Sequence, residues 1–451
     1  MLGLLFTGCE SYLEGFEQDP NNPSDAPPEL MIAHVEAADL MIHEGELART
    51  AGMWIRYFTG SDRQYISYET YNVNSGDFDN AWGNAYWGVV QQARIVASKA
   101  EVIGDNVLQG VAQILEAHTM GTVTAIWGDV PFSEAADVEQ FPTPSYDGQA
   151  SVYAGLQTLL DEALVNVKDA TNEYAQITTL GSWTEVANSL KARYYMHTGE
   201  YANALAAASA GISDPANEWI GTHACATLAS INVYNNFIDW ERGGYMTADA
   251  SVTYNMLGVD DPMYRGNAKT DESVRRAFYF LDDASCAGYT YGAIDPNWCD
   301  GMFSICGDFP MFSWCENELI KAECEIRVNS DNDAALGHLN AVRQNLAAFY
   351  GAQYDDYEIA DFEGGGIANS GGDATESLLT EILEEKYLCL YGQIEGWSDL
   401  RRKDNTFRAT IPAATGDNFP ERLPYPQTEI NSNPNTPSPI PGLFEATPVN
   451  Q

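Results

Sequence analysis

Apolar residues recur at helical spacing through much of this chain, and that pattern constrains the fold more than any other feature. Within 148–167 the apolar positions are separated by 4, 3, 1, 3, 1 and 3 residues, the spacing of one amphipathic stripe. The positions are Val152, Leu156, Leu159, Leu160, Ala163, Leu164 and Val167. A second stripe in 335–349 consists of Leu336, Leu339, Val342, Leu346 and Phe349. The pattern predicts a mainly helical protein.

Short helices joined by tight turns are expected on either side of residue 199. Ser182 and Glu185 have the spacing of a capping box, which predicts a helix from there to about His197. Gly199 breaks this helix, and 201–212 predicts a second one. Pairs of this kind stack in tetratricopeptide-type repeats. We therefore expect an all-α fold on a tetratricopeptide-like helical scaffold.

Composition divides the chain into six segments of what we expect to be one domain: 1–9, 10–27, 28–212, 213–315, 316–403 and 404–451. The third and fifth carry the helical repeats, and the second is a polar tether. The fourth is rich in Gly, Asn, Tyr, Trp and Cys, and such a long irregular region is more often a functional, ligand-binding subdomain than a linker. From Pro412 on, the last segment holds nine of the twenty prolines, so we expect an extended, non-helical surface tail.

Charge excludes one large class of function. The chain has 22 basic and 65 acidic residues, a net charge of −43. Nucleic-acid binding requires clustered Lys and Arg, so no nucleic-acid partner is expected. With 45% hydrophobic residues the chain can still form a packed core, and disorder is not expected either.

The N-terminus carries a targeting signal. Residues 1–9 form a short apolar run that ends in small residues and Cys9, and this run resembles the end of a bacterial lipoprotein signal peptide. The resemblance implies that Cys9 is lipidated and anchors the protein to a membrane. The alternative is a fragment of a core helix with a buried cysteine.

Five further cysteines lie close together in the second half of the chain. An exported protein permits disulfides, and we expect one or two bridges among Cys286, Cys299, Cys306 and Cys315. Cys324 and Cys389 fall in helical patterns and are expected to be buried thiols. Because no C-x-x-C is present, no metal site is expected.

Seven short blocks follow one another along the chain: WGDVPFSEA (127–135), PSYDGQ (144–149), ANSLKAR (187–193), ELIKAE (318–323), NAVR (340–343), EGWSDLRR (395–402) and RLPYP (422–426). Together and in this order they resemble the SusD/RagB family, the surface nutrient-binding lipoproteins of Bacteroidetes-type bacteria. Most of these residues are interpreted as scaffold. Glu395, Asp399, Arg401 and Arg402 are expected to form a charge network around a packed Trp397.

The resemblance implies a function. It implies a lipid-anchored protein on the cell surface at the outer membrane that captures oligosaccharides and delivers them to a SusC-like TonB-dependent transporter. It implies no enzyme activity, no catalytic residues and no cofactor. Peptide capture by a RagB-like protein is the alternative within the family.

Candidate ligand-binding residues follow from the chemistry of sugars, whose flat C–H faces need exposed aromatic platforms beside planar polar groups. Two regions offer them. The first contains Arg63, Tyr65, Trp82 and Asn84, of which Trp82 and Asn84 are the best positional match to the family. The second is the loop region, with Trp240, Tyr291 and Trp298, and with Arg242, Tyr245, Tyr289 and Trp314 as further candidates. Trp87 is expected to turn into the helix core.

Two other functions stay open. An all-helical glycoside hydrolase is a distant alternative, although the six histidines form no H-E-x-x-H motif and the chain has no G-x-S-x-G motif. A repeat scaffold that binds only protein partners is the other, and it would require the loop aromatics to be buried.

Overall fold

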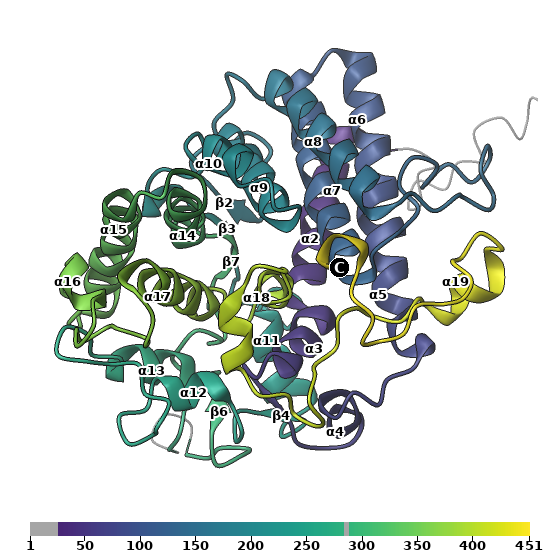
Figure 1. Ribbon diagram of the computed structural model, residues 1–451. Coiled ribbons are helices and arrows are strands. Elements are labelled where there is room, and N and C mark those ends of the chain that lie inside the picture. The colour runs from purple at the N-terminus through teal and green to yellow at the C-terminus, as the bar shows by residue number, and fades with distance from the viewer. Residues whose placement is uncertain (1–25, 284–287) are drawn as a thin grey trace, which may run out of the picture.

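Helix α7 (Asn106–Trp127) runs through the middle of the first helical region, and the neighbouring helices pack around it (Figure 1). The computed structural model describes residues 26–283 and 288–451. In it α7 contacts α2 (Pro28–Glu44), α6 (Gln91–Ile103) and α8 (Gln149–Asn166). Its side chains are almost all buried, so α7 is a central element of the core.

The other helices divide between the two ends of the chain. In the first half they are α3 (Glu46–Trp54), α4 (Gln64–Glu69), η1 (Ser75–Phe78), α5 (Asp79–Gly83), the π-helical η2 (Asn84–Val90), α9 (Trp183–His197) and α10 (Tyr201–Ala208). The loop region holds η3 (Pro215–Asn217), α11 (Val233–Asn235), the π-helical η4 (Asn236–Glu241), α12 (Val252–Met256) and α13 (Ser273–Tyr279). The second half has α14 (Trp314–Cys324), η5 (Glu325–Asn329), α15 (Asn332–Tyr350), α16 (Ile359–Phe362), α17 (Ala374–Cys389), α18 (Ile394–Leu400), η6 (Thr406–Thr410), α19 (Gln427–Ser432) and η7 (Pro448–Asn450).

The predicted all-α fold is confirmed, and so are its main helices. The stripe in 148–167 forms α8, and the stripe in 335–349 forms α15. Ser182 caps α9, because its hydroxyl accepts the backbone N–H of Glu185 at 3.2 Å. Helices α6 and α7, α9 and α10, and α14 and α15 pack as pairs, as in a tetratricopeptide-like scaffold. One stripe position was wrong: Phe349 lies at the helix end and is 65% exposed.

Within residues 26–283 and 288–451, seven short strands pair with one another, and two of their sheets connect the loop region to the helical part. β1 (Thr59–Gly60) pairs antiparallel with β4 (Met246–Thr247), with Thr59 opposite Thr247. β2 (Thr178–Thr179), β3 (Trp219–Gly221) and β7 (Phe309–Phe312) form one antiparallel sheet, and β5 (Phe280–Leu281) pairs with β6 (Asp295–Pro296). Buried residues of the loop region belong to the same core as those of both helical regions. The boundaries between the six segments stay predictions.

The C-terminal tail differs from the expectation of an extended surface strap. It contains the short helix α19, and Phe419, Leu423 and Tyr425 are buried. The Leu423 N–H donates to the Ile126 carbonyl at 2.8 Å, and Trp127 Nε1 donates to the Pro424 carbonyl at 3.0 Å. Prolines prevent a long helix, but they do not prevent a segment from filling the core through the side chains between them. The tail thus packs against the end of α7.

The cysteine predictions are partly wrong. Cys306 forms a disulfide with Cys225, which lies outside the predicted set, across a sequence separation of 81 residues. Cys299 is disulfide-bonded, whereas Cys315 is a free buried thiol. Cys315 is the second residue of α14, and the sequence pattern did not show whether it belongs to this helix or to the loop before it. Cys324 and Cys389 are free thiols, as expected, although Cys389 is only half-buried. Cys286 and Cys9 lie outside the described residues.

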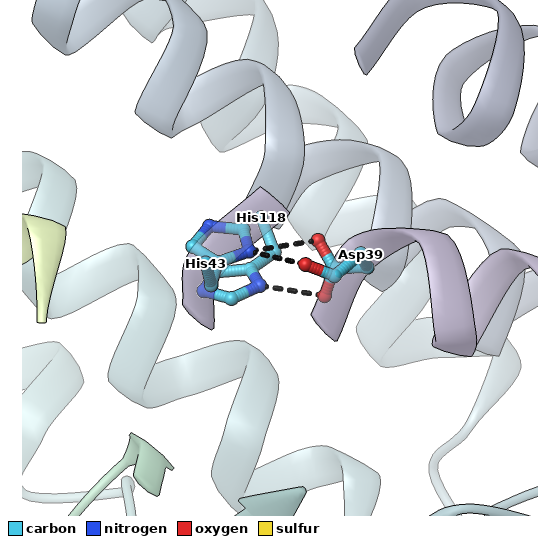
Figure 2. A group of neighbouring side chains, drawn as sticks. All are labelled: Asp39, His43 and His118. Carbon is cyan, nitrogen blue, oxygen red and sulfur yellow. Dashed lines mark hydrogen bonds and ion pairs between the residues drawn. The ribbon is translucent and has the colours of Figure 1, made fainter. Parts of the chain in front are cut away.

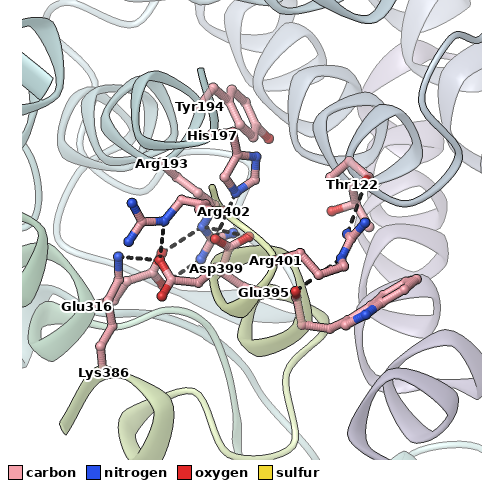
Figure 3. A network of polar contacts seen from close by, with 12 residues as sticks. Thr122, Arg193, Tyr194, His197, Glu316, Lys386, Glu395, Asp399, Arg401 and Arg402 are labelled. Atoms are coloured by element: carbon pink, nitrogen blue, oxygen red, sulfur yellow. Dashed lines mark hydrogen bonds and ion pairs between the residues drawn. The ribbon is translucent and has the colours of Figure 1, made fainter. Parts of the chain in front are cut away.

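Buried ion pairs join the helices of the two halves (Figure 3). Arg193 on α9 donates to both carboxylate oxygens of Glu316 on α14, at 2.7 and 2.6 Å. Asp399 on α18 accepts from Lys386 at 2.6 Å and from Arg402 at 2.9 Å. These groups are almost fully buried, so each charge needs its partner to offset the loss of hydration.

Trp397 lies inside this network, as predicted. It is 1% exposed, its Nε1 donates to the Pro420 carbonyl at 3.0 Å, and the guanidinium carbon of Arg401 lies 3.9 Å from its ring centre. Arg401 donates to the carbonyls of Trp397 and Ala125 and not to a carboxylate of the network. Among the described residues, no helix is long and apolar enough to cross a membrane.

Replacing Trp397 with Ala should lower the free energy of unfolding by about 3–5 kcal/mol, because it leaves a large cavity under Arg401. Urea denaturation followed by tryptophan fluorescence measures the effect. The matched control is Trp87→Ala, since Trp87 is 74% exposed and its removal creates no cavity. Equal denaturation midpoints for Trp397→Ala and the wild type would contradict the packing described here.

Removing the Cys225–Cys306 disulfide should also destabilise the protein. A closed loop of this length restricts the unfolded chain and contributes up to about 4 kcal/mol. The double variant Cys225→Ser/Cys306→Ser should therefore unfold at lower urea concentration than the wild type without reductant, and reductant should narrow the difference. A midpoint that is identical for both proteins without reductant would show that the bridge contributes nothing.

Candidate ligand-binding face

The pairing of β1 with β4 brings Arg63 onto Tyr245, 182 residues later in the chain. The Ser61 N–H donates to the Tyr245 carbonyl at 2.8 Å and extends the pairing by one bond. Arg63 Nη1 donates to the Tyr245 hydroxyl at 2.6 Å, and its guanidinium carbon lies 4.9 Å from the Tyr245 ring centre. The Arg242 guanidinium carbon lies 5.8 Å from the same ring centre. Two cationic, planar groups therefore surround one tyrosine.

The backbone of Arg63 is strained. Its φ of 47° lies in the left-handed region that L residues other than Gly rarely adopt. The neighbouring Asp62 holds it there: one carboxylate oxygen accepts the Arg63 N–H at 2.9 Å, and the other accepts Nη1 at 3.0 Å. Strain of this kind is concentrated at functional sites.

Aromatic side chains of the loop region lie beside a single carboxylate. The hydroxyls of Tyr289 and Tyr291 both donate to Asp239 Oδ1, at 2.8 and 3.0 Å. Trp240, the next residue in η4, is 56% exposed, and Tyr289 is 46% exposed. Burial and the Asp239 hydrogen bond raise the pKa of Tyr291, so the phenol keeps its proton at neutral pH. We call Arg63, Asp239, Trp240, Arg242, Tyr245, Tyr289 and Tyr291 the Tyr245 face.

Two predicted site residues lie beneath this face instead of on it. Tyr65 is 4% exposed, packs 5.0 Å from the Phe237 ring, and its hydroxyl accepts Arg49 Nε at 3.0 Å. Trp298 is 6% exposed and packs 5.3 Å from Tyr289. Neither offers an open ring face, because both side chains belong to the common core. Trp314, the first residue of α14, is buried in the same core.

The other two predicted residues, Trp82 and Asn84, lie away from the Tyr245 face. Trp82 is 7% exposed and packs edge-on against Trp127, with ring centres 5.2 Å apart. Asn84 is exposed. Trp87, expected in the core, is 74% exposed and lines a hollow of about 140 Å³ with Trp82 and Phe141. Trp87 belongs to the π-helix η2, whose wider turn changes which side chains face the core.

Sequence reasoning named Tyr245, Arg242 and Tyr289 only as members of a region, and it missed Asp239. The available signal was the run Asp239-Trp-Glu-Arg-Gly-Gly-Tyr245, in which two glycines reverse the chain between the aromatic residues.

Asp39, His43 and His118 form a buried cluster whose donor atoms lie within 4.8 Å of one another (Figure 2). His118 Nδ1 donates to Asp39 Oδ2 at 2.8 Å, Thr119 donates to Oδ1 at 2.6 Å, and the two imidazole rings stack 3.7 Å apart. His118 Nε2 lies 3.4 Å from the Arg193 guanidinium. The donors are thus occupied by internal bonds beside a fixed cation, which fits a structural network better than a metal centre.

Comparison with known proteins places the chain in a family. A SusD-like family model described as "Starch-binding associating with outer membrane" matches residues 20–426, which is most of the chain. The chain belongs to this SusD-like family. Membership supports a nutrient- or glycan-binding role associated with the outer membrane. Among curated proteins, no sequence matches.

Solved structures show the same fold. A SusD/RagB family protein from Bacteroides thetaiotaomicron has 20% identity, with 91% of this chain and 95% of that chain covered, at a TM-score of 0.64. A SusD homologue from Bacteroides uniformis has 16% identity, with 95% and 100% covered, at a TM-score of 0.68. A structure described as a chitin-binding protein has 17% identity, with 90% and 94% covered, at a TM-score of 0.64.

Stability of this SusD-like protein should depend on pH through His118. Burial lowers the pKa of His118 to about 4, although Asp39 raises it, whereas an unfolded histidine titrates near 6.5. Between about pH 4 and pH 6.5, His118 carries a proton in the unfolded chain but not in the folded chain. The contribution of His118 to the free energy of unfolding therefore falls by about 3 kcal/mol as pH drops through this window.

Comparison with His118→Gln isolates this contribution from the other titrating groups. The stability difference between wild type and His118→Gln, measured by urea denaturation, should be smaller at pH 4.5 than at pH 7. The control is His34→Gln, since His34 is exposed on α2. A difference that is the same at both pH values would show that His118 does not titrate in this window.

Proposed function

We propose that this protein is a cell-surface glycan-binding lipoprotein that captures oligosaccharides on the Tyr245 face and delivers them to a SusC-like TonB-dependent transporter. The observation that carries the proposal is the combination of two exposed aromatic rings, Trp240 and Tyr289, with the guanidinium groups around Tyr245. Sugars stack their C–H faces on such rings, while planar donors bind their hydroxyls.

A neutral glycan is the favoured ligand class. The family description refers to starch and one structural neighbour is described as chitin-binding, and both of these polysaccharides are neutral or nearly so. Asp62, Asp239 and Glu241 lie next to the two arginines in sequence or in space, so the face carries no clear excess of positive charge. Binding without catalysis fits this arrangement, because the face offers stacking and hydrogen bonding.

Peptide capture is the second candidate, and one observation favours it. Within the described part of the chain Arg242 forms no ion pair, and its guanidinium donates only to the Glu241 carbonyl, at 3.0 Å. A guanidinium that is exposed and lacks a carboxylate partner suits the C-terminal carboxylate of a peptide.

The anchor and the partner complete the proposal. Cys9 lies outside the described residues, and its lipidation rests on the resemblance of 1–9 to a lipoprotein signal. Lipid attachment would hold the protein at the outer membrane, where the family description places its members. Delivery to a transporter explains why a binding protein would be anchored there.

Isothermal titration against maltooligosaccharides, chitooligosaccharides and oligopeptides tests the ligand site. Arg63→Ala and Trp240→Ala should each weaken the best-bound ligand about tenfold or more, which is about 1.4 kcal/mol or more, with unchanged melting temperatures. Trp87→Ala is the matched control, because Trp87 is also an exposed tryptophan but lies off the Tyr245 face. Full affinity in Trp240→Ala together with loss in Trp87→Ala would move the site to the other hollow.

A further inference from the structure

Helix α2 buries three of its carboxylates together with most of its apolar side chains, yet leaves two large apolar side chains exposed. Glu36 and Glu44 are 1% and 0% exposed, whereas Leu30 is 72% and Met41 is 54% exposed. Both carboxylates have interior partners: Glu36 accepts the Gln176 N–H at 2.8 Å, and Glu44 accepts the Val233 N–H at 3.0 Å. Glu36 and Glu44 thus bind other segments of the chain, and of the acidic residues of α2 only Glu29, in the first turn, is even half-exposed.

The neighbouring helical stretch of η2 and α6 continues this surface. Trp87, Ile95, Val102 and Ile103 are 74%, 36%, 84% and 56% exposed. The stretch runs antiparallel to α2, since Lys99 Nζ donates to the Ala26 carbonyl at 2.8 Å near one end. Gly88 lies against Ala38 near the other end. Both α2 and α6 pack on α7, so their outer surfaces face the same side of the molecule.

Among the exposed residues of this surface, few are charged. The exposed residues of α2, η2 and α6 are Leu30, His34, Met41, Asn84, Trp87, Ile95, Ser98, Glu101, Val102 and Ile103, and only Glu101 is acidic. We call these residues the α2/α6 face. In a chain of net charge −43, an exposed surface of apolar residues that spans two helices is exceptional. Such surfaces mark interaction sites, whose centres are depleted of charge and enriched in aromatic residues.

The position of the face indicates its partner. Ala26, Pro27 and Pro28, the first residues that the structure describes, line a groove with Val102 and Ile103 at one edge of the face. Cys9 precedes Ala26 by 17 residues, a length that reaches at most about 60 Å when extended. A lipid on Cys9 therefore keeps Ala26, at the edge of the face, within this distance of the bilayer, where a transporter in the same membrane can reach the face.

We propose that the α2/α6 face is the surface on which the TonB-dependent transporter docks, with Trp87, beside its hollow, as an aromatic anchor. This inference rests on the proposed function. On other surfaces of so acidic a protein, docking would desolvate carboxylates. This costs free energy unless each carboxylate forms an ion pair with a cationic group of the partner. On the α2/α6 face, docking removes mainly apolar area from water, and a tryptophan beside a hollow is the usual form of an interface hot spot.

The test uses the full lipidated chain, tagged after the exposed Gln451 and extracted from host outer membranes with mild detergent. Mass spectrometry measures the ratio of the TonB-dependent transporter encoded beside it to the tagged protein. The variant is Leu30→Asp/Val102→Asp, and the matched control is Val165→Asp/Val259→Asp, whose valines are 76% and 72% exposed elsewhere. The ratio should fall tenfold or more in the variant and stay within twofold in the control, with unchanged melting temperature and glycan affinity in both.

Each other outcome overturns the inference. A wild-type ratio in the Leu30→Asp/Val102→Asp variant would exclude the face while leaving the proposed function intact, and so would an equal loss in the control. A wild-type preparation without any TonB-dependent transporter would defeat the delivery step of the proposed function and the docking face with it.

Two measurements on unlipidated Cys9→Ala protein test for other occupants. If light scattering shows a dimer, and the Leu30→Asp/Val102→Asp variant is a monomer, the face binds a second copy of the chain. If the protein floats with phosphatidylcholine vesicles, and the two aspartate substitutions abolish this flotation, the face binds lipid. Either result would replace the transporter as the occupant.

Discussion

Buried ion pairs between α9, α14, α17 and α18 are the constraint on which the rest of the structure depends. Arg193–Glu316 joins α9 to α14, and Arg402 holds Glu323 of α14 at 2.8 Å, next to Asp399. Because an unpaired buried charge is far costlier than a missing apolar contact, these helices cannot shift separately. Trp397 fills the space that the pairs enclose, and Arg401 carries the constraint to the carbonyl end of α7. We call these four helices and their ion pairs the frame. Because the frame is fixed, the loop region can be irregular.

The frame matters for function because the Tyr245 face has little regular structure of its own. Arg63 is held in a strained conformation by Asp62, and it reaches Tyr245 only through the two-residue pairing of β1 and β4. Short strands give weak pairing by themselves, so their position must come from the helices on which they rest. Loops that present binding residues on a rigid scaffold can vary while the scaffold stays the same. Ligand preference within a fold shared at 16–20% identity is expected to be located in such loops.

How far the sequence could predict this protein depends on the kind of signal at each position. Helical periodicity was sufficient for α8 and α15, and the capping-box spacing was sufficient for α9. The positional match to the family failed at Trp82, which is buried, and Trp87 is exposed in the π-helix η2. In the loop region neither burial nor contact follows a period, so Trp298 could not be distinguished from Trp240. Asp239 binds tyrosines that lie 50 and 52 residues later, and the only local signal was the two-glycine turn that follows it. The Cys225–Cys306 bridge was missed for the same reason, because its partners are distant in sequence.

The packing of the C-terminal tail has a consequence for how the chain reaches its destination. Leu423 and Pro424 bind the end of α7, almost 300 residues earlier in the chain, and Arg422 reaches the Trp127 carbonyl beside them. A nascent chain that has made α7 but not yet these last residues therefore lacks part of the core, and contacts so distant in sequence form late. If the chain is exported as a lipoprotein, as we propose, this delay is useful, because translocation requires a chain that has not yet folded. The tail completes the core, so it would also delay the end of folding until the chain has crossed the membrane.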